Sequence, residues 1–478
     1  MEMQIKPSAG AADVQKVTDL IKRTVRNPQN IEPSKISKKH KIKEKYLQTP
    51  TAKKPPKREW APRFWLGCDT FAWVRLMSKG HFAWHAPHWY IGASTFAVSL
   101  GHTVLKWFQQ GLYGSKIQNT KFKEDPVFIV GHWRTGTTLL HELLITDPNH
   151  NFPNTYQCME PNHFLLTEEI SKKYLGFLMP DHRPMDNMKA GWDRPQEDEF
   201  ALCMLGLPSP YLHVAFPNQP PIDQNAFDIS SLPRSTQRTW KKYFYRYLQT
   251  LTFRDPRRLI LKSPPHSCRI PMLLELFPKA RFVHIVRNPY SVYPSTVRLW
   301  KSLYLKHGMQ NPDNRGVEEY VYSTFLNLYD KLEEGRKQVP ANQFYEIRYE
   351  DLIANPLQEM ESLYQHLNLG DFGRVKPFLQ SYLDQNATYE TNRYELSNEE
   401  TSKITQRWGR VIEHYGYPLT KSDENPDKSS LIEKISPTNP TIPMDIQEIS
   451  PRDRKEKNQI QLTPSAISPT LNRIAKVG

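Results

Sequence analysis

The sequence predicts an α/β fold in which helices flank a central parallel sheet and a helical N-terminal leader precedes it. Three observations predict this fold: short apolar runs rich in β-branched residues, helix-length segments between them, and a glycine-bounded turn after the first run. That first run, 127–130, lies between Pro126 and Gly131 and is typical of a buried parallel strand. Further strands are expected at 258–262, 281–286 and 343–349. Ligands of parallel sheets bind at the carboxyl ends of the strands, so we expect the functional site there.

Composition divides the 478 residues into four segments. Residues 1–60 and 418–478 are rich in Pro, Ser and Lys and lack hydrophobic periodicity, which predicts disorder. Residues 61–120 carry an uneven helical stripe and form the predicted leader. The main domain is expected to span 121–417.

The positive charge is concentrated in the first segment, a basic arm. Residues 1–60 hold 15 Lys and Arg against 6 Asp and Glu, which gives +9 of the formal +14. Such an arm could meet nucleic acid or an anionic membrane surface. A solvated flexible tail is the favoured interpretation, and we expect no specific nucleic-acid partner.

Cysteine usage and the apolar segments bear on the compartment. The four cysteines are scattered and form no CxxC pair, so we expect reduced thiols and no structural zinc. No secretory signal pattern opens the chain, which favours a cytoplasmic location. Residues 80–105 contain no charged side chain and are long enough to cross a membrane, but their histidines and hydroxyl groups oppose insertion. A buried or interfacial helix is favoured, and the interfacial case would make the protein peripheral to a membrane.

The turn after the first strand has the spacing of a phosphate loop. Two glycines, Gly131 and Gly136, are separated by four residues, and a helix is expected from Thr137 through Leu144. Such a turn brings backbone amides and a helix N-terminus onto an anion, which makes the predicted sheet P-loop-like. Thr137 stands where a nucleoside triphosphatase has lysine, so an ATPase or kinase is disfavoured. Arg134 can supply the positive charge instead.

The run Trp133-Arg134-Thr135-Gly136-Thr137-Thr138 resembles the 5′-phosphosulfate loop of sulfotransferases that use 3′-phosphoadenosine-5′-phosphosulfate (PAPS). It is most similar to the branch with Arg in place of Lys, which includes tyrosylprotein and bacterial sulfotransferases. Cytosolic members follow the two threonines with Trp, whereas this chain has Leu139. The resemblance implies that the 5′-phosphosulfate is held by Arg134, Thr135, Gly136, Thr137 and Thr138.

Two later motifs extend the resemblance over about residues 125–417 and make 121–417 the sulfotransferase domain. Arg287, at the end of a strand, is followed eight residues later by Ser295, similar to the 3′-phosphate motif of the family. Tyr349 begins a segment similar to the one whose tyrosine approaches adenine. The C-terminal Arg-Lys-Gly motif of the cytosolic members is absent.

Sulfuryl transfer requires a base and cations. Lys262 ends a strand and His266 follows it, similar to the Lys-x-His of cytosolic members, so Lys262 is expected to stabilise the sulfonate and His266 to deprotonate the acceptor. Glu197 and Glu199 compete with His266, because some members use a glutamate base; one of them could instead orient His266.

The predicted function is transfer of a sulfuryl group from PAPS, as cosubstrate, to an acceptor hydroxyl or amine. His132 and His141 flank the loop without matching carboxylates, and the chemistry requires no metal. Two alternatives stay open: a nucleotide or nucleoside kinase on the same fold, and a noncatalytic anion-binding protein of a membrane surface. The acceptor is not specified and could be a carbohydrate, lipid, peptide or small molecule.

Overall fold

The computed structural model describes residues 63–175, 191–386 and 394–420. The basic arm and all but the first three residues of the predicted C-terminal tail lie outside these ranges, so the predictions made for them stay predictions.

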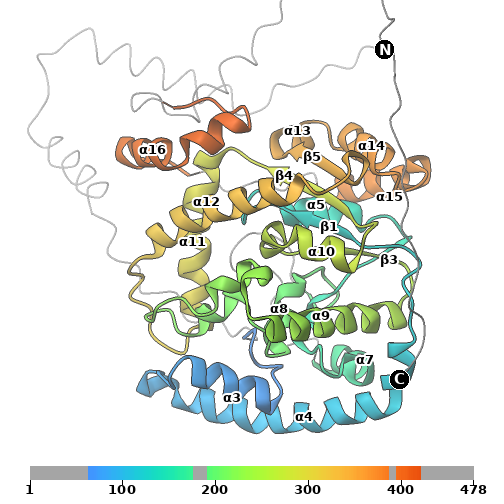
Figure 1. Cartoon of the computed structure of the whole chain (residues 1–478), viewed down its shortest axis with the longest axis vertical. Helices are drawn as coiled ribbons and strands as arrows, with labels where there is room; N and C mark the ends of the chain where they lie inside the picture. The colour runs from blue at the N-terminus through green and yellow to red at the C-terminus, as the bar shows by residue number, and fades with distance from the viewer. Residues whose placement is uncertain (1–62, 176–190, 387–393, 421–478) are drawn as a thin grey trace, which may run out of the picture. The chain divides into compact units, whose positions relative to one another are not determined.

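A five-stranded parallel sheet in the order β2-β3-β1-β4-β5 forms the centre of the described domain (Figure 1). The predicted fold class is confirmed. The expected fourth strand is one residue shorter at each end than predicted, and the two-residue strand at the sheet edge was not predicted. The strands are β1 (Val127–Val130), β2 (His150–Asn151), β3 (Arg258–Lys262), β4 (Arg281–Val286) and β5 (Phe344–Arg348).

Helices fill the segments between the strands. The α-helices are α3 (Thr70–Lys79), α4 (Trp89–Gln118), α5 (Thr137–Leu144), α6 (Thr155–Met159), α7 (Phe164–Leu175), α8 (Asp198–Met204), α9 (Arg234–Arg254), α10 (Ile270–Leu276), α11 (Pro289–His307), α12 (Val317–Arg336), α13 (Tyr349–Ala354), α14 (Pro356–Leu367), α15 (Phe372–Gln385) and α16 (Asn398–His414). Short 3-10 turns are η2 (Ala86–His88), η4 (Pro210–Ala215), η5 (Gln224–Phe227), η6 (Ile229–Ser231), η7 (Pro264–Cys268) and η8 (Ala341–Gln343).

Alternating side chains of β1 build two separate cores on the two faces of the sheet. Val127 and Ile129 pack with residues of α5, α14 and α15. Phe128 and Val130 pack with residues of α9 and α10. Because both faces are covered, all four β1 side chains are buried, as expected for a central parallel strand.

The leader contains α3 and α4, which pack against each other at the edge of the domain (Figure 1). The Thr70 amide donates to Thr103 Oγ1 at 3.0 Å, and Lys106 forms an ion pair with Asp69. Most of the uncharged stretch 80–105 lies in α4, which continues to Gln118. None of the described helices combines the length and hydropathy that a transmembrane span requires.

Burial on α4 is inverted relative to an ordinary surface helix. The side facing the protein carries small polar residues, and Thr95 and Ser99 are fully buried. The outward side carries large apolar residues, and Trp107 is 63% exposed. An amphipathic helix of a soluble domain normally turns its apolar stripe inward. The exposed apolar residues of α3, α4 and the turn between them are Phe71, Val74, Phe82, Trp89, Tyr90, Phe96, Val98, Leu100, Val104, Trp107, Phe108 and Leu112, named here the outer leader face.

Candidate active site

The turn between β1 and α5 has the geometry of an anion site. Gly131 (φ 143°) and Gly136 (φ 101°) adopt backbone conformations that favour glycine. A Cβ atom at Gly131 would lie 2.6 Å from the Ile285 carbonyl oxygen, so the loop passes too close to β4 for a side chain. Among the described residues no side chain caps α5 at Gly136, which leaves the first amides of the helix to an anion.

The two predicted phosphate motifs meet at this loop. Arg134 has φ 69°, a strained conformation for a residue with a side chain, and its Nε donates to Ser295 Oγ on α11 at 2.8 Å. Arg287, at the end of β4, donates from Nη1 to the Arg134 carbonyl oxygen at 3.2 Å, across 153 residues of sequence. The fold therefore brings both arginines and Ser295 to one end of the sheet.

Tyr349 closes one side of the same loop. A Cβ atom at Gly136 would lie 2.4 Å from its ring, and the Arg287 guanidinium carbon lies 4.2 Å from the ring centroid. Burial raises the pKa of the Tyr349 hydroxyl. The Arg287 guanidinium thus packs over this ring. The predicted approach of Tyr349 to adenine stays a prediction.

The three threonines of the loop differ in burial and hydrogen bonding. Thr135 is fully buried and donates from Oγ1 to the His132 carbonyl oxygen at 2.7 Å, which shapes the turn. Thr137 is buried and begins α5, and Thr138 is partly exposed beside it. Burial lowers the pKa of His132 to about 3, so this imidazole is neutral.

Glu197 and Lys262 form the charged pair beside the loop. Lys262 ends β3 as the register partner of Ile129 in β1, and its Nζ lies 2.7 Å from Glu197 Oε1. Tyr211 donates its hydroxyl to Glu197 Oε2, and Trp133 Nε1 donates to Tyr211 at 2.8 Å. Burial and then the Glu197 charge raise the pKa of Tyr211 well above its ordinary value, so the phenol stays protonated. A hydrogen-bonded chain therefore links the loop to Lys262.

His266 lies inside the domain, bonded to a residue that was not predicted. Its Nε2 lies 2.6 Å from Asp198 Oδ2, both side chains are 0% exposed, and Ser263 donates to Asp198 Oδ1 at 2.9 Å. Burial alone would raise the pKa of Asp198, but the His266 charge and these hydrogen bonds together lower it. An enclosed imidazole does not reach an acceptor, so this placement does not support the expectation that His266 is the base.

Glu199 is also enclosed. Arg269 donates Nη1 to Glu199 Oε2 at 2.5 Å and Nη2 to Oε1 at 3.0 Å, and both side chains are 0% exposed. Ser209 adds a hydrogen bond to Oε1 at 2.6 Å. Glu199 contacts neither Lys262 nor His266 in these bonds; it closes a buried ion pair, which does not support a role as base or as the group that orients His266.

The three consecutive acids have different partners, because Glu197 is the extended N-cap residue of α8 whereas Asp198 and Glu199 lie in its first turn. Successive residues of an α-helix are rotated by about 100°, so neighbours at the start of α8 cannot share one target. Sequence reasoning singled out Lys262 and Glu197 as candidates, but it did not name their neighbour Tyr211 or the buried partners Asp198 and Arg269. Asp198 stood between two candidates and could have been included; Tyr211 carried no local signal, because only the fold brings it to Glu197.

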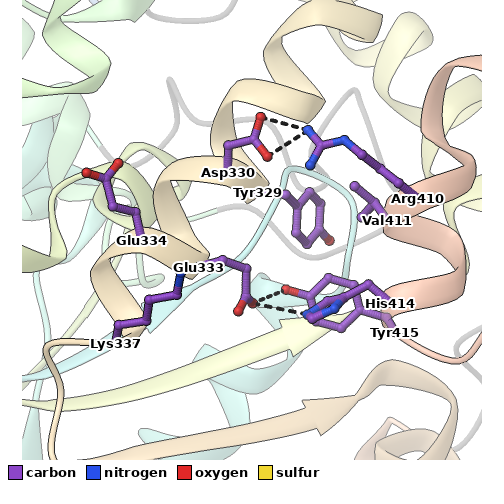
Figure 2. Close-up of a pocket in the computed structure, with 9 residues that line it drawn as sticks. All are labelled: Tyr329, Asp330, Glu333, Glu334, Lys337, Arg410, Val411, His414 and Tyr415. Carbon is purple, nitrogen blue, oxygen red and sulfur yellow. Dashed lines mark hydrogen bonds and ion pairs between the residues drawn. The ribbon is translucent and has the colours of Figure 1, made fainter.

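A separate cavity of about 310 Å³ lies between α12 and α16 (Figure 2). None of the predicted site residues lines it. Its carboxylates are engaged: Asp330 pairs with Arg410, and Glu333 accepts a hydrogen bond from Tyr415. Three acidic side chains against two basic ones make it unsuited to a polyanionic donor.

Comparison with known proteins agrees with this geometry. The model of the Sulfotransferase family matches residues 126–372. Omega-hydroxy-beta-dihydromenaquinone-9 sulfotransferase Stf3 from Mycobacterium bovis and its namesake from Mycobacterium tuberculosis are each 47% identical to this chain over 360 residues, covering 75% of this chain and 92% of the relative. The crystal structure of sulfotransferase STF9 from Mycobacterium avium shares the fold, with a TM-score of 0.52 and 20% identity over 66% of this chain and 82% of that one. The chain therefore belongs to the sulfotransferase family, and it is a transferase.

Proposed function

We propose that this sulfotransferase transfers the sulfuryl group of PAPS to a hydroxyl group of a lipid acceptor at a membrane surface. Membership of the family favours this function over the kinase and the noncatalytic anion-binding protein that the sequence left open. The observation that carries the proposal is the meeting of Arg134, Ser295 and Arg287 at the N-terminus of α5.

The donor would bind across this meeting point. The loop amides, Thr137, Thr138 and Arg134 would hold the 5′-phosphosulfate, because a helix N-terminus and a guanidinium both favour an anion. Arg287 and Ser295 would hold the 3′-phosphate, with Arg287 preoriented by its stacking on Tyr349. The 3′-phosphate contact would distinguish PAPS from ATP.

Glu197 is the proposed base. Its carboxylate is 13% exposed, so an acceptor hydroxyl can reach it, whereas His266 and Glu199 are enclosed at 0%. The acceptor O–H proton passes to Glu197 as the acceptor oxygen forms its bond to sulfur. The bond between sulfur and the phosphate oxygen breaks, and 3′,5′-phosphoadenosine leaves with that electron pair.

Lys262 and Arg134 would stabilise the charge that develops on the sulfuryl and departing phosphate oxygens. Before the donor binds, Lys262 pairs with Glu197 at 2.7 Å, so each group has a partner while the site is empty of substrate. Donor binding would draw Lys262 towards the sulfonate and release the carboxylate for the proton.

A lipid acceptor follows from the outer leader face together with the relatives. The named acceptor of the Stf3 relatives is an omega-hydroxylated menaquinone, an isoprenoid lipid. Residues 70–123 of this chain contain six Lys and Arg and no Asp or Glu. Lys79 and Lys106 pair with Asp223 and Asp69, and the remaining positive charge complements an anionic lipid surface. Exposed aromatics such as Trp107 and Phe108 are suited to the interfacial layer of a bilayer. The face would dock on the membrane that holds the acceptor.

The test is transfer of label from sulfur-labelled PAPS. Purified protein would be given vesicles containing a hydroxylated isoprenoid lipid, and in parallel a soluble phenol. We expect label in the lipid with wild type and with Arg410→Ala, a control arginine remote from the loop, and none with Arg134→Ala. Label found only in the phenol would reject the lipid acceptor, and no transfer from PAPS to any acceptor would reject the donor.

A further inference from the structure

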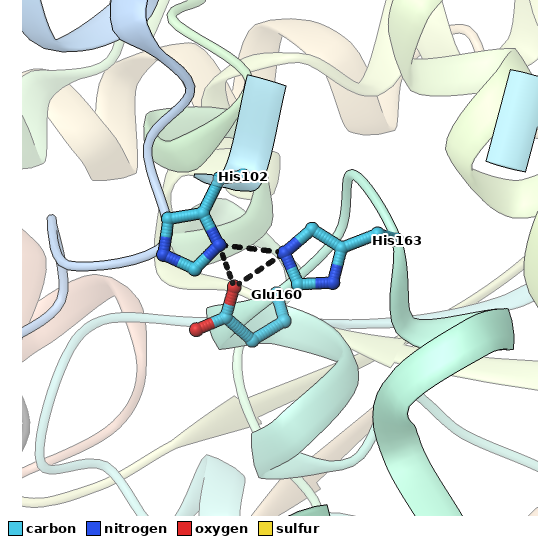
Figure 3. A group of neighbouring side chains, drawn as sticks. All are labelled: His102, Glu160 and His163. Carbon is cyan, nitrogen blue, oxygen red and sulfur yellow. Dashed lines mark hydrogen bonds and ion pairs between the residues drawn. The ribbon is translucent and has the colours of Figure 1, made fainter. Parts of the chain in front are cut away.

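Two histidines and a glutamate from distant parts of the sequence converge between the leader and the domain (Figure 3). His102 lies on α4, while Glu160 and His163 lie in the short segment between α6 and α7. His102 Nδ1 lies 2.7 Å from His163 Nε2. Glu160 Oε2 lies 3.2 Å from the first nitrogen and 3.1 Å from the second. Three potential ligand atoms thus face a single point.

Each of the two histidine rings makes a hydrogen bond through the nitrogen that faces away from the cluster, which leaves a lone pair on the nitrogen that faces it. His163 Nδ1 lies 3.0 Å from Thr167 Oγ1, whose own proton is donated to the His163 carbonyl oxygen, so Nδ1 donates and Nε2 carries a lone pair. His102 also hydrogen-bonds to the Leu66 backbone carbonyl; since Nδ1 faces His163, that bond falls to Nε2–H. Both facing nitrogens are therefore acceptors.

Two lone pairs and a carboxylate oxygen that face each other repel unless a cation lies between them. Glu160 Oε2 is shielded from solvent and has no hydrogen-bond donor among the described residues. Burial strengthens the repulsion, because the His163 side chain is only 3% exposed. We propose that His102, Glu160 and His163 bind a divalent transition-metal ion, with Zn²⁺ as the best match.

The ligand set and geometry suit zinc. Two imidazole nitrogens and one carboxylate oxygen are common zinc ligands, with water in the fourth position. Ligand atoms about 2.05 Å from a tetrahedral ion lie about 3.3 Å apart, so the nitrogens need to separate by only about 0.6 Å. Hydrogen bonds from the second ring nitrogen to a carbonyl or hydroxyl are what ligating histidines usually make.

The proposed ion would have a structural role. It would join α4, which carries most of the outer leader face, to the segment that leads into α7. Transfer of the sulfuryl group does not require it, and the inference does not depend on the proposed acceptor. Sequence inspection predicted no metal, because His102 stands 58 residues before Glu160 and 61 before His163, and the Glu160–His163 pair, three residues apart, is not by itself a recognisable metal site.

Metal analysis of the purified full chain tests the proposal. The apoprotein, prepared with a chelator, would be titrated with zinc chloride in a calorimeter. We expect one zinc ion per chain for wild type and for His414→Ala, a control histidine that is 54% exposed on α16. Affinity should fall about a hundredfold or more in His163→Ala.

X-ray absorption of zinc-loaded wild type provides a readout that does not depend on how the variant folds. Two imidazole ligands and no sulfur are expected at about 2.0–2.1 Å from the ion. No stoichiometric binding, sulfur ligands, or equal affinity in His163→Ala would each overturn the proposal. Nuclear magnetic resonance of the metal-free protein can detect a proton shared by the two rings. If this proton is found and the protein also fails to bind zinc, a hydrogen-bonded histidine pair replaces the proposed metal site.

Discussion

The strand-end site and the outer leader face follow opposite rules of burial. At the strand ends, charged side chains are paired within the domain: Lys262 with Glu197, which is 13% exposed, and the enclosed pairs His266 with Asp198 and Arg269 with Glu199. On α4, small polar residues face the protein and large apolar residues face outward. The first region satisfies its own polar groups, as buried charges require. The second leaves its apolar groups without a described partner.

This difference separates two kinds of function. A site whose charges are paired within the domain is preorganised for chemistry before substrate arrives. A contiguous exposed apolar face marks an interaction with something outside the domain. If this distinction holds, substitutions at the strand ends should alter catalysis or folding, whereas substitutions of the exposed apolar residues of the outer leader face should alter association alone.

The largest expected effect separates the base from the enclosed residues. Glu197→Gln keeps the shape of the side chain but removes the proton acceptor, so kcat should fall by about 10²–10⁴-fold. Because this change also removes the anion that pairs with the buried Lys262 ammonium, Tm should fall as well. His266→Gln removes a buried partner of Asp198 and should lower Tm by several degrees while kcat of the folded protein stays within about tenfold. Steady-state kinetics and thermal unfolding of both variants check this.

The reverse pattern would contradict the assignment. A catalytically dead His266→Gln with unchanged Tm, beside an active Glu197→Gln, would return the role of base to the imidazole. Glu318→Gln, which is 64% exposed on α12, is the matched control for the amide substitution and should behave as wild type.

The second effect concerns the enclosed ion pair. Arg269→Met leaves the Glu199 carboxylate buried without its cation, and the free energy of unfolding should fall by about 3–5 kcal/mol. The double variant Arg269→Met with Glu199→Met removes both charges and should recover much of that loss. Urea denaturation measures both. A loss below about 1 kcal/mol in the single variant would mean that the pair is not enclosed in solution.

A smaller effect is expected on the outer leader face. Replacing Trp107 and Phe108 together by Ser should weaken binding to anionic vesicles about tenfold or more, because about 1.5–3 kcal/mol of transfer free energy is lost for each buried aromatic side chain. Turnover of a soluble acceptor should stay unchanged. Vesicle sedimentation measures the binding, and Phe378→Ser, which removes an aromatic side chain 51% exposed on α15, is the control. Equal binding by both variants would refute the docking face.

The smallest effect is a pH dependence at Asp198. The pKa of this carboxyl in the folded protein lies below its ordinary value of 3.8. The stability that it contributes is therefore present above the ordinary pKa and is lost as pH falls through the folded value. Free energy of unfolding should decrease between about pH 5 and pH 2, and less steeply in Asp198→Asn. Identical slopes for the two proteins would contradict the lowered pKa.

Sequence reasoning found the features that are local in the chain. A strand, a glycine-bounded turn and a helix each depend on consecutive residues. The position of the loop at Gly131 and Gly136 and the bounds of four strands were therefore predicted to within one residue. The order of the strands and the meeting of Arg134 with Arg287 require the folded sheet. The direction of each acid at the start of α8 depends on its exact position, which is why Glu199 was expected in the site and lies in the core; His266, in η7, lies in the core because the fold pairs it with Asp198.

The most direct test of the donor site is calorimetric titration with 3′,5′-phosphoadenosine and with adenosine 5′-phosphate. The two ligands differ only in the 3′-phosphate that Arg287 and Ser295 are proposed to hold. Wild type should bind the first about tenfold or more tightly than the second, since hydrogen bonds to a charged group contribute about 1.5–3 kcal/mol, and Arg287→Ala should remove most of this preference. Equal affinity of wild type for the two ligands, or an unchanged preference in Arg287→Ala, would contradict the account.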